Sequence, residues 1–149
     1  MEAESSAPLP LWAIALAALS PFPISAWIYA YGPSEHAEFA LTVILTWSAI
    51  VLSFVGGVRW GLETARDEPR SARLAGSVIG PIFAWTLIIA RGAWPDTWLL
   101  CGFLSAFLVQ WLFDHTAPDV PSRWPRLLTV LTLGAGLSLA IALEQALRM

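Results

Sequence analysis

Five long segments without a charged side chain divide this sequence, and they constrain its fold more than any other feature. Each contains at least 17 residues, which as an α-helix reaches the lower limit for crossing the hydrocarbon core of a bilayer. The composition agrees, with 57% hydrophobic and 13% charged residues, against about 25% charged in soluble domains. The five segments are residues 10–31, 39–58, 74–90, 97–113 and 127–143.

The spacing of these segments predicts an all-α polytopic membrane protein with a single transmembrane domain over residues 1–149. Turns rich in glycine, proline and charged residues separate the segments, so we expect a bundle of five transmembrane helices. The first apolar run follows Glu2 and Glu4 without a basic residue and exceeds a usual signal-peptide core, so we expect it to be retained. The predicted helices cover about residues 10–31, 37–64, 72–91, 96–114 and 123–146.

The distribution of arginine predicts the orientation of this bundle. Six arginines fall on one predicted side and two on the other, and the sequence has no lysine. The positive-inside rule places the six in the cytoplasm, with the N-terminus cytoplasmic and the C-terminus periplasmic in a bacterial inner (plasma) membrane. Nine tryptophans make the chain tryptophan-rich, and most of them fall near the two predicted interfaces. The two arginine groups are Arg59, Arg66, Arg70, Arg73, Arg123 and Arg126, and Arg91 and Arg148.

Small residues recur every four positions within the second segment. Four-residue spacing stacks side chains on one helix face, and small side chains let another backbone approach closely in lipid. This pattern predicts a helix-packing seam, which a weaker repeat in the third segment extends. The predicted packing residues are Ala49, Ser53, Gly56, Gly57, Gly61, Gly76 and Gly80.

Prolines inside two of the segments predict helix breaks. Pro21 and Pro23 remove two backbone donors in the middle of the first span, and Pro81 removes one in the third. The first break has two interpretations. It is a kink whose backbone groups Ser20 or Ser25 helps to satisfy, or it is a broken helix that lines a cavity.

Charged and aromatic residues converge at the predicted cytoplasmic surface. One interpretation is structural: arginines belong at this surface, and Asp114 pairs with one of them. The other is a lipid head-group or ligand site, in which Arg59 and Arg126 grip an anionic group between tryptophan walls. The residues of this hypothetical site are Arg59, Trp60, Asp114, Trp124 and Arg126.

The sequence predicts no metal, no cofactor and no nucleic-acid partner. His36 and His115 fall on opposite sides of the predicted membrane, and Cys101 is the only cysteine. The usual motifs for hydrolysis, zinc catalysis and nucleotide binding do not occur. An enzyme would have to use Asp114 with His115 as its base, with no third group evident. We therefore expect a protein that is not an enzyme.

Three stretches resemble a known family. They are Leu19-Ser-Pro-Phe22, the run from Ser53 to Gly61 with the sequence SFVGGVRWG, and Asp114 followed by the run WPRLLTVLT from Trp124 to Thr132. They are similar to a bacterial integral membrane family of unknown function that is related to transmembrane protein 69. The resemblance implies small proteins of bacterial inner membranes and of mitochondria, and it implies no activity. Tryptophan-rich sensory protein is another five-helix family. This sequence does not match it, because the Lys-Pro and Trp-x-Pro-Pro signals found early in that family do not occur here.

These patterns together predict a small integral membrane protein that binds lipid or another amphiphile and acts as an accessory or assembly factor. Its expected partners are membrane lipids and, as a further option, a larger membrane complex or a second copy of itself. The alternative is a small transporter or channel, which a homo-oligomer would form around the broken first helix.

Overall fold

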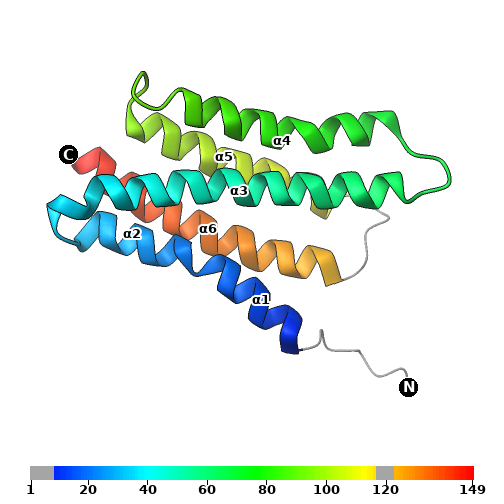
Figure 1. Ribbon diagram of the computed structural model, residues 1–149, viewed down its shortest axis with the longest axis horizontal. Coiled ribbons are helices and arrows are strands. Elements are labelled where there is room, and N and C mark those ends of the chain that lie inside the picture. Colours follow the sequence, from blue (N-terminus) through cyan, green and yellow to red (C-terminus); the bar gives the residue numbers. More distant parts are fainter. Residues whose placement is uncertain (1–8, 117–122) are drawn as a thin grey trace.

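The described part of the chain folds into six α-helices and one short 3-10 helix. The computed structural model describes residues 9–116 and 123–149, with the side chains of residues 12–116 and 126–149. The helices lie side by side along one long axis (Figure 1). They are α1 (Leu9–Leu19), α2 (Pro21–Tyr31), η1 (Ser34–His36), α3 (Ala37–Thr64), α4 (Ser71–Ile89), α5 (Asp96–His115) and α6 (Arg123–Arg148).

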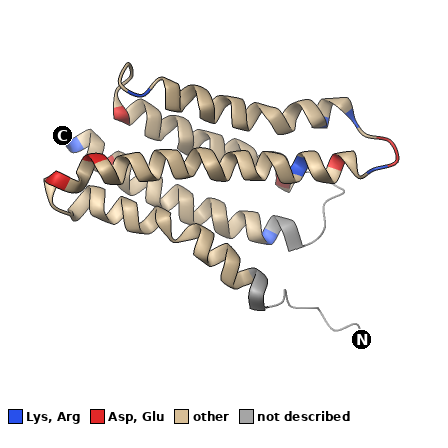
Figure 2. Ribbon diagram, in the orientation of Figure 1, with Lys and Arg blue, Asp and Glu red and all other residues tan. Residues whose placement is uncertain are grey.

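Five helical spans are long and apolar enough to cross a membrane, and α1 and α2 together form the first of them. This confirms the predicted all-α, multi-pass membrane fold, and no strand is assigned within residues 9–116 and 123–149. Charged residues gather at the two ends of the bundle and leave its middle apolar (Figure 2). One end carries Arg59 and the α3–α4 turn, and we call it the Arg59 end. The other carries Arg91 and the C-terminus, and we call it the Arg91 end. Which end faces the cytoplasm stays a prediction.

The α3 helix forms the centre of the bundle. Half of its most apolar window is buried, against 17% of the corresponding window of α4. Its buried residues, which include Leu41, Ile44, Leu45 and Leu52, recur three, four and seven positions apart and so form one broad stripe. The α2, α4 and α5 helices pack against α3. In lipid such contacts stabilise the bundle by close packing, since the surrounding hydrocarbon is equally apolar.

The first span is interrupted at Ser20, directly before Pro21. Pro21 has no N–H to donate to the carbonyl of Ala17, and the Ser20 hydroxyl donates to that carbonyl instead, at 2.8 Å. The indole N–H of Trp47 on α3 donates to the neighbouring carbonyl of Ala18, also at 2.8 Å. Pro23 lies in the first turn of α2, where helical N–H groups have no intrahelical partner in any case.

Pro81, the third predicted break, lies inside α4, which continues without interruption from Ser71 to Ile89. Because Pro81 has no N–H, the carbonyl of Ser77 loses its intrahelical donor. This carbonyl faces Gly56 on α3, where a Cβ atom would lie only 2.5 Å from its oxygen. The Pro81 ring covers the same glycine, with its Cγ 2.8 Å from that Cβ position. The carbonyl that Pro81 leaves without a donor in α4 therefore packs against Gly56 of α3.

The structure places this close approach at Gly56, a predicted packing residue that lies outside the repeat of every fourth residue. Ser53, Gly57 and Gly61 lie on the exposed surface of α3, and a Cβ atom at Gly57 or Gly61 would meet nothing within 4 Å. The reason is geometric: 3.6 residues per turn shift every fourth residue by about 40° around the axis, so the row winds away from the neighbouring helix. Only Ala49, at its start, packs against the core.

The two predicted packing glycines of α4 also differ in whether they contact a neighbouring helix. A Cβ atom at Gly76 would meet nothing within 4 Å, whereas one at Gly80 would lie 3.1 Å from Oε1 of Gln110 on α5. Gly56 and Gly80 are therefore the predicted packing glycines that touch neighbouring helices, and both lie near the Arg59 end.

Candidate functional site

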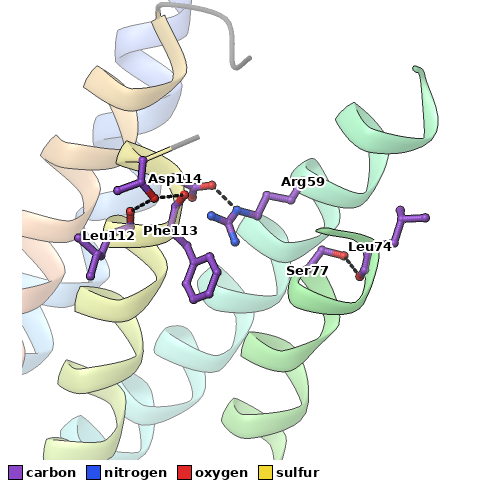
Figure 3. A network of polar contacts seen from close by, with 7 residues as sticks. Arg59, Leu74, Ser77, Leu112, Phe113 and Asp114 are labelled. Atoms are coloured by element: carbon purple, nitrogen blue, oxygen red, sulfur yellow. Dashed lines mark hydrogen bonds and ion pairs between the residues drawn. The ribbon is translucent and has the colours of Figure 1, made fainter. Parts of the chain in front are cut away.

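An ion pair between α3 and α5 is the centre of the candidate site. The Nε–H of Arg59 donates to Oδ1 of Asp114 (Figure 3). The Asp114 side chain is 3% exposed and that of Arg59 is 16% exposed. The guanidinium also lies over the ring of Phe113, 5.6 Å from its centroid, in a cation–π arrangement. The pair lies at the end of two apolar spans, where long side chains reach the bilayer interface.

Polar atoms that complete no hydrogen bond lie beside this ion pair. The Oδ2 atom of Asp114 and the Nε2 atom of Gln110, one helical turn earlier on α5, are both buried and without a hydrogen-bond partner. Ser77 on α4 is buried as well, and its hydroxyl donates to the carbonyl of Leu74 at 2.6 Å (Figure 3). Three helices thus bring polar groups together around this ion pair.

A second ion pair closes the turn between α3 and α4. Glu63 accepts three hydrogen bonds from Arg70: from the backbone N–H at 2.8 Å, from Nε at 2.9 Å and from Nη2 at 3.2 Å. The Glu63 side chain is only 8% exposed. Because Glu63 is one turn after Arg59, this clamp fixes the end of α3 from which Arg59 extends.

Trp60 and Arg126, two other residues of the predicted site, form no hydrogen bond or ion pair with Arg59 or Asp114. Trp60 points to the surface and is 48% exposed. Arg126 is exposed on α6 and makes no ion pair or hydrogen bond with a described residue. The side chain of Trp124 lies outside the described residues. The structure therefore assembles Arg59 and Asp114, and it leaves Trp60 and Arg126 as exposed residues of the same end.

His115 is engaged away from Asp114. Its ring stacks on Trp111 with 5.0 Å between centroids and 19° between planes. The indole N–H of Trp111 donates to Oγ1 of Thr129 and so joins α5 to α6. Asp114 and His115 thus make different contacts, which leaves them without the geometry of an acid–base pair. Among the described residues, no group of three or more histidine, cysteine, aspartate and glutamate side chains is arranged to hold a metal ion.

Asp114 and Arg59 differ in how many of their polar atoms are engaged. Toward the interior, Asp114 is enclosed and engaged by one guanidinium nitrogen. The two NH₂ groups of Arg59, in contrast, make no hydrogen bond to a described residue. An arginine in this state presents a planar pair of donors that suits a phosphate or carboxylate.

Sequence reasoning missed three contributors to this site. Phe113, which lies under the guanidinium, carries no signal beyond its position next to Asp114. Gln110 could have been found, because it precedes Asp114 by four residues and so lies on the same face of α5. Ser77 could have been found, because it precedes Pro81 by four residues and its carbonyl must therefore lack the usual donor.

Comparisons with known proteins agree on a membrane family without an assigned activity. A protein family described as a protein of unknown function, DUF3429, matches residues 7–144. The chain is also similar to Transmembrane protein 69 of Xenopus tropicalis, with 27% identity over 143 residues. That match covers 93% of this chain and 55% of the relative, so the chain spans about half the length of the curated relative. No solved structure matches significantly.

Proposed function

The chain belongs to the DUF3429 family of proteins of unknown function, and we propose that it is a non-enzymatic accessory or assembly protein that binds an anionic amphiphile through Arg59. The anionic group is a lipid phosphate or an equivalent carboxylate. The protein is placed in the bacterial inner membrane, with its Arg59 end in the cytoplasm, because six of its eight arginines fall on this side.

One observation carries this proposal: Asp114 and Phe113 hold the Arg59 side chain in place, while its two NH₂ groups form no hydrogen bond to a described residue. Asp114 engages only Nε, and Phe113 supports the guanidinium from one side. The side chain therefore loses little further conformational entropy when its two NH₂ groups grip an anion. A position at the end of an apolar span matches the depth of lipid phosphates.

Two exposed residues extend this surface. Trp60, next in sequence to Arg59, has the amphipathic indole that favours the bilayer interface. Arg126, in the first turn of α6, supplies a second cation at the same end, where it adds to the attraction for an anionic head group. Neither side chain forms an ion pair or hydrogen bond with a described residue.

The test compares lipid retention between variants whose folding is protected. Arg59→Gln alone leaves the enclosed Asp114 carboxylate unpaired, so the informative variant is Arg59→Gln combined with Asp114→Asn. After reconstitution into nanodiscs of phosphatidylglycerol and phosphatidylcholine, native mass spectrometry counts the retained lipids. We expect wild type to retain phosphatidylglycerol preferentially and the double variant to lose this preference.

Arg91→Gln, combined with Glu38→Gln, is the matched control, because it removes an ion pair of 3.2 Å at the opposite end. This control should keep the preference for phosphatidylglycerol. Unchanged selectivity in the Arg59 and Asp114 double variant would show that the proposed head-group site does not exist.

The alternative, a transporter or channel built around the broken first helix, has a weaker basis. A break that serves an aqueous path exposes backbone carbonyls to solute, as in many transporters. Here the carbonyls of Ala17 and Ala18 already accept hydrogen bonds from Ser20 and Trp47. Solute flux through proteoliposomes that contain the purified protein would nevertheless favour this alternative over the lipid-binding function.

A further inference from the structure

The break in the first span opens a recessed apolar crevice against α6. Where α1 leaves the axis of α2 (Figure 1), a space of about 270 Å³ remains between these helices and α6. We call this space the helix-break crevice. It is lined by Leu19, Pro23, Trp27, Gly134, Leu137, Ser138 and Ile141.

The crevice is closed toward the middle of the bundle. Leu19 lies so close to Gly134 that a Cβ atom there would be 2.6 Å from its Cδ2 atom. Ser138 adds no exposed polarity, because its hydroxyl donates to the carbonyl of Gly134 at 2.8 Å. From this floor the crevice extends along α6 to Ile141, toward the Arg91 end.

The dimensions of the crevice identify the kind of occupant. The seven-residue rise from Gly134 to Ile141 gives a length of about 10 Å. An apolar cavity of about 150 Å³ is large enough to bind benzene, so the space of about 270 Å³ has room for a longer hydrocarbon segment. A single polymethylene chain, with van der Waals contacts at about 4 Å, fits this space.

The outer end of the crevice suits the polar part of a lipid. Trp27 lines it, and Tyr31 lies one turn further along α2, with 4.7 Å between the two ring centroids. Both side chains are 65% exposed. An indole N–H and a phenol O–H at this depth are the donors that meet ester and glycerol oxygens at a membrane interface.

We propose that the helix-break crevice holds one hydrocarbon chain of a membrane lipid from the leaflet on the Arg91 side, with the lipid's polar part beside Trp27 and Tyr31. This site is separate from the proposed head-group site at Arg59, which lies at the opposite end of the bundle. A chain in the crevice contacts α1, α2 and α6 together, so it exchanges more slowly than lipid on a convex helix surface.

The test uses a phosphatidylglycerol that carries a photoactivatable diazirine in one acyl chain, in vesicles of phosphatidylglycerol and phosphatidylethanolamine. After irradiation, mass spectrometry maps the labelled residues of the full-length protein. We expect Leu137 and Ile141 to be labelled several-fold more than Ile79 and Ile82 on α4, although Ile79 and Ile82 are exposed at least as much as Ile141. Even labelling of all four residues would overturn the proposal, whatever the behaviour of any variant.

Ser138→Leu fills the crevice, and Ser53→Leu is its matched control. Both serines donate to the carbonyl four residues earlier at 2.8 Å, but Ser53 lies on the exposed face of α3. The excess labelling should disappear in Ser138→Leu and persist in Ser53→Leu. Retained labelling in a folded Ser138→Leu protein, or crosslinks from Leu137 to a second copy of the chain, would overturn the proposal. Arg59→Gln with Asp114→Asn should leave the labelling unchanged, which separates this site from the proposed head-group site at Arg59.

Discussion

The backbone carbonyl of Ser77 on α4 lies against Gly56 on α3, in the space that any larger residue at position 56 would fill. A Cβ atom at this glycine would lie 2.5 Å from the Ser77 oxygen and 2.8 Å from Cγ of Pro81. Proline and glycine thus act together: Pro81 leaves the carbonyl without its helical donor, and Gly56 gives it room. A weak Cα–H···O contact from the glycine is the interaction this geometry permits.

Gly56→Ala should therefore destabilise the bundle, by about 1–3 kcal/mol as for other overpacked cores. The obstructing atoms belong to a backbone carbonyl and a proline ring, and neither can rotate away. Gly57→Ala is the matched control, because a Cβ atom there meets nothing within 4 Å, and it should be neutral or stabilise the protein by up to about 1 kcal/mol, since Ala has the higher helix propensity. The free energy of unfolding can be measured in mixed micelles with increasing SDS. Equal stability of the two variants would contradict the packing described here.

Substitutions in the ion pair should have unequal effects. Arg59→Gln leaves the enclosed Asp114 without its partner, whereas Asp114→Asn leaves Arg59, which can turn toward the interface. We expect the first change to cost about 2 kcal/mol, below the 3–5 kcal/mol typical of fully buried pairs, and the second to cost less. The double variant should recover part of the loss. A double-mutant cycle on unfolding free energies measures this coupling, and purely additive effects would refute it.

Trp47→Phe should weaken the junction between α1 and α2. The substitution keeps an aromatic ring but removes the indole N–H that donates to the carbonyl of Ala18 at 2.8 Å. The expected loss is about 1 kcal/mol, the usual net value of one such hydrogen bond. Trp85→Phe serves as the control, because Trp85 is 66% exposed on α4. Amide hydrogen exchange should also become faster in α1 in the first variant only, and unchanged exchange there would count against this role.

Glu63→Gln should lower the melting temperature more than Glu38→Gln. Glu63 is enclosed and accepts three hydrogen bonds from Arg70, while Glu38 is 85% exposed and pairs with Arg91 through a single contact of 3.2 Å. Exposed pairs of the second kind contribute little to stability. Thermal unfolding of the two purified variants in the same detergent checks the order. The reverse order would show that the α3–α4 clamp is dispensable.

The orientation can be tested with single cysteines at the two ends. In a Cys101→Ala background, Glu68→Cys lies in the α3–α4 turn and Ala93→Cys lies between α4 and α5. The positive-inside rule predicts that a membrane-impermeant maleimide labels position 93 in intact bacterial spheroplasts, and position 68 only after permeabilisation. Labelling in the opposite order would invert the assignment of the Arg59 end to the cytoplasm.

The sequence alone determined the number of spans, the place of the first break and the grouping of charges at two ends. These features are local. A run of uncharged residues is apolar wherever the helix packs, and Pro21 lacks its N–H in every environment. For the same reason the sequence could place Arg59 and Asp114 near one plane, and could name Ser20 as a residue that helps to satisfy the break.

Only the tertiary structure decided which faces of these helices meet. The repeat from Ala49 to Gly61 suggested one packing row, but its rotation around α3 carries Gly57 and Gly61 to the surface. Gly56 is the contact instead, because α4 presents a carbonyl there that Pro81 has freed. Likewise, Arg59 and Asp114 are 55 residues apart in the chain, and their pairing, which engages only Nε of Arg59, exists only because α5 packs beside α3.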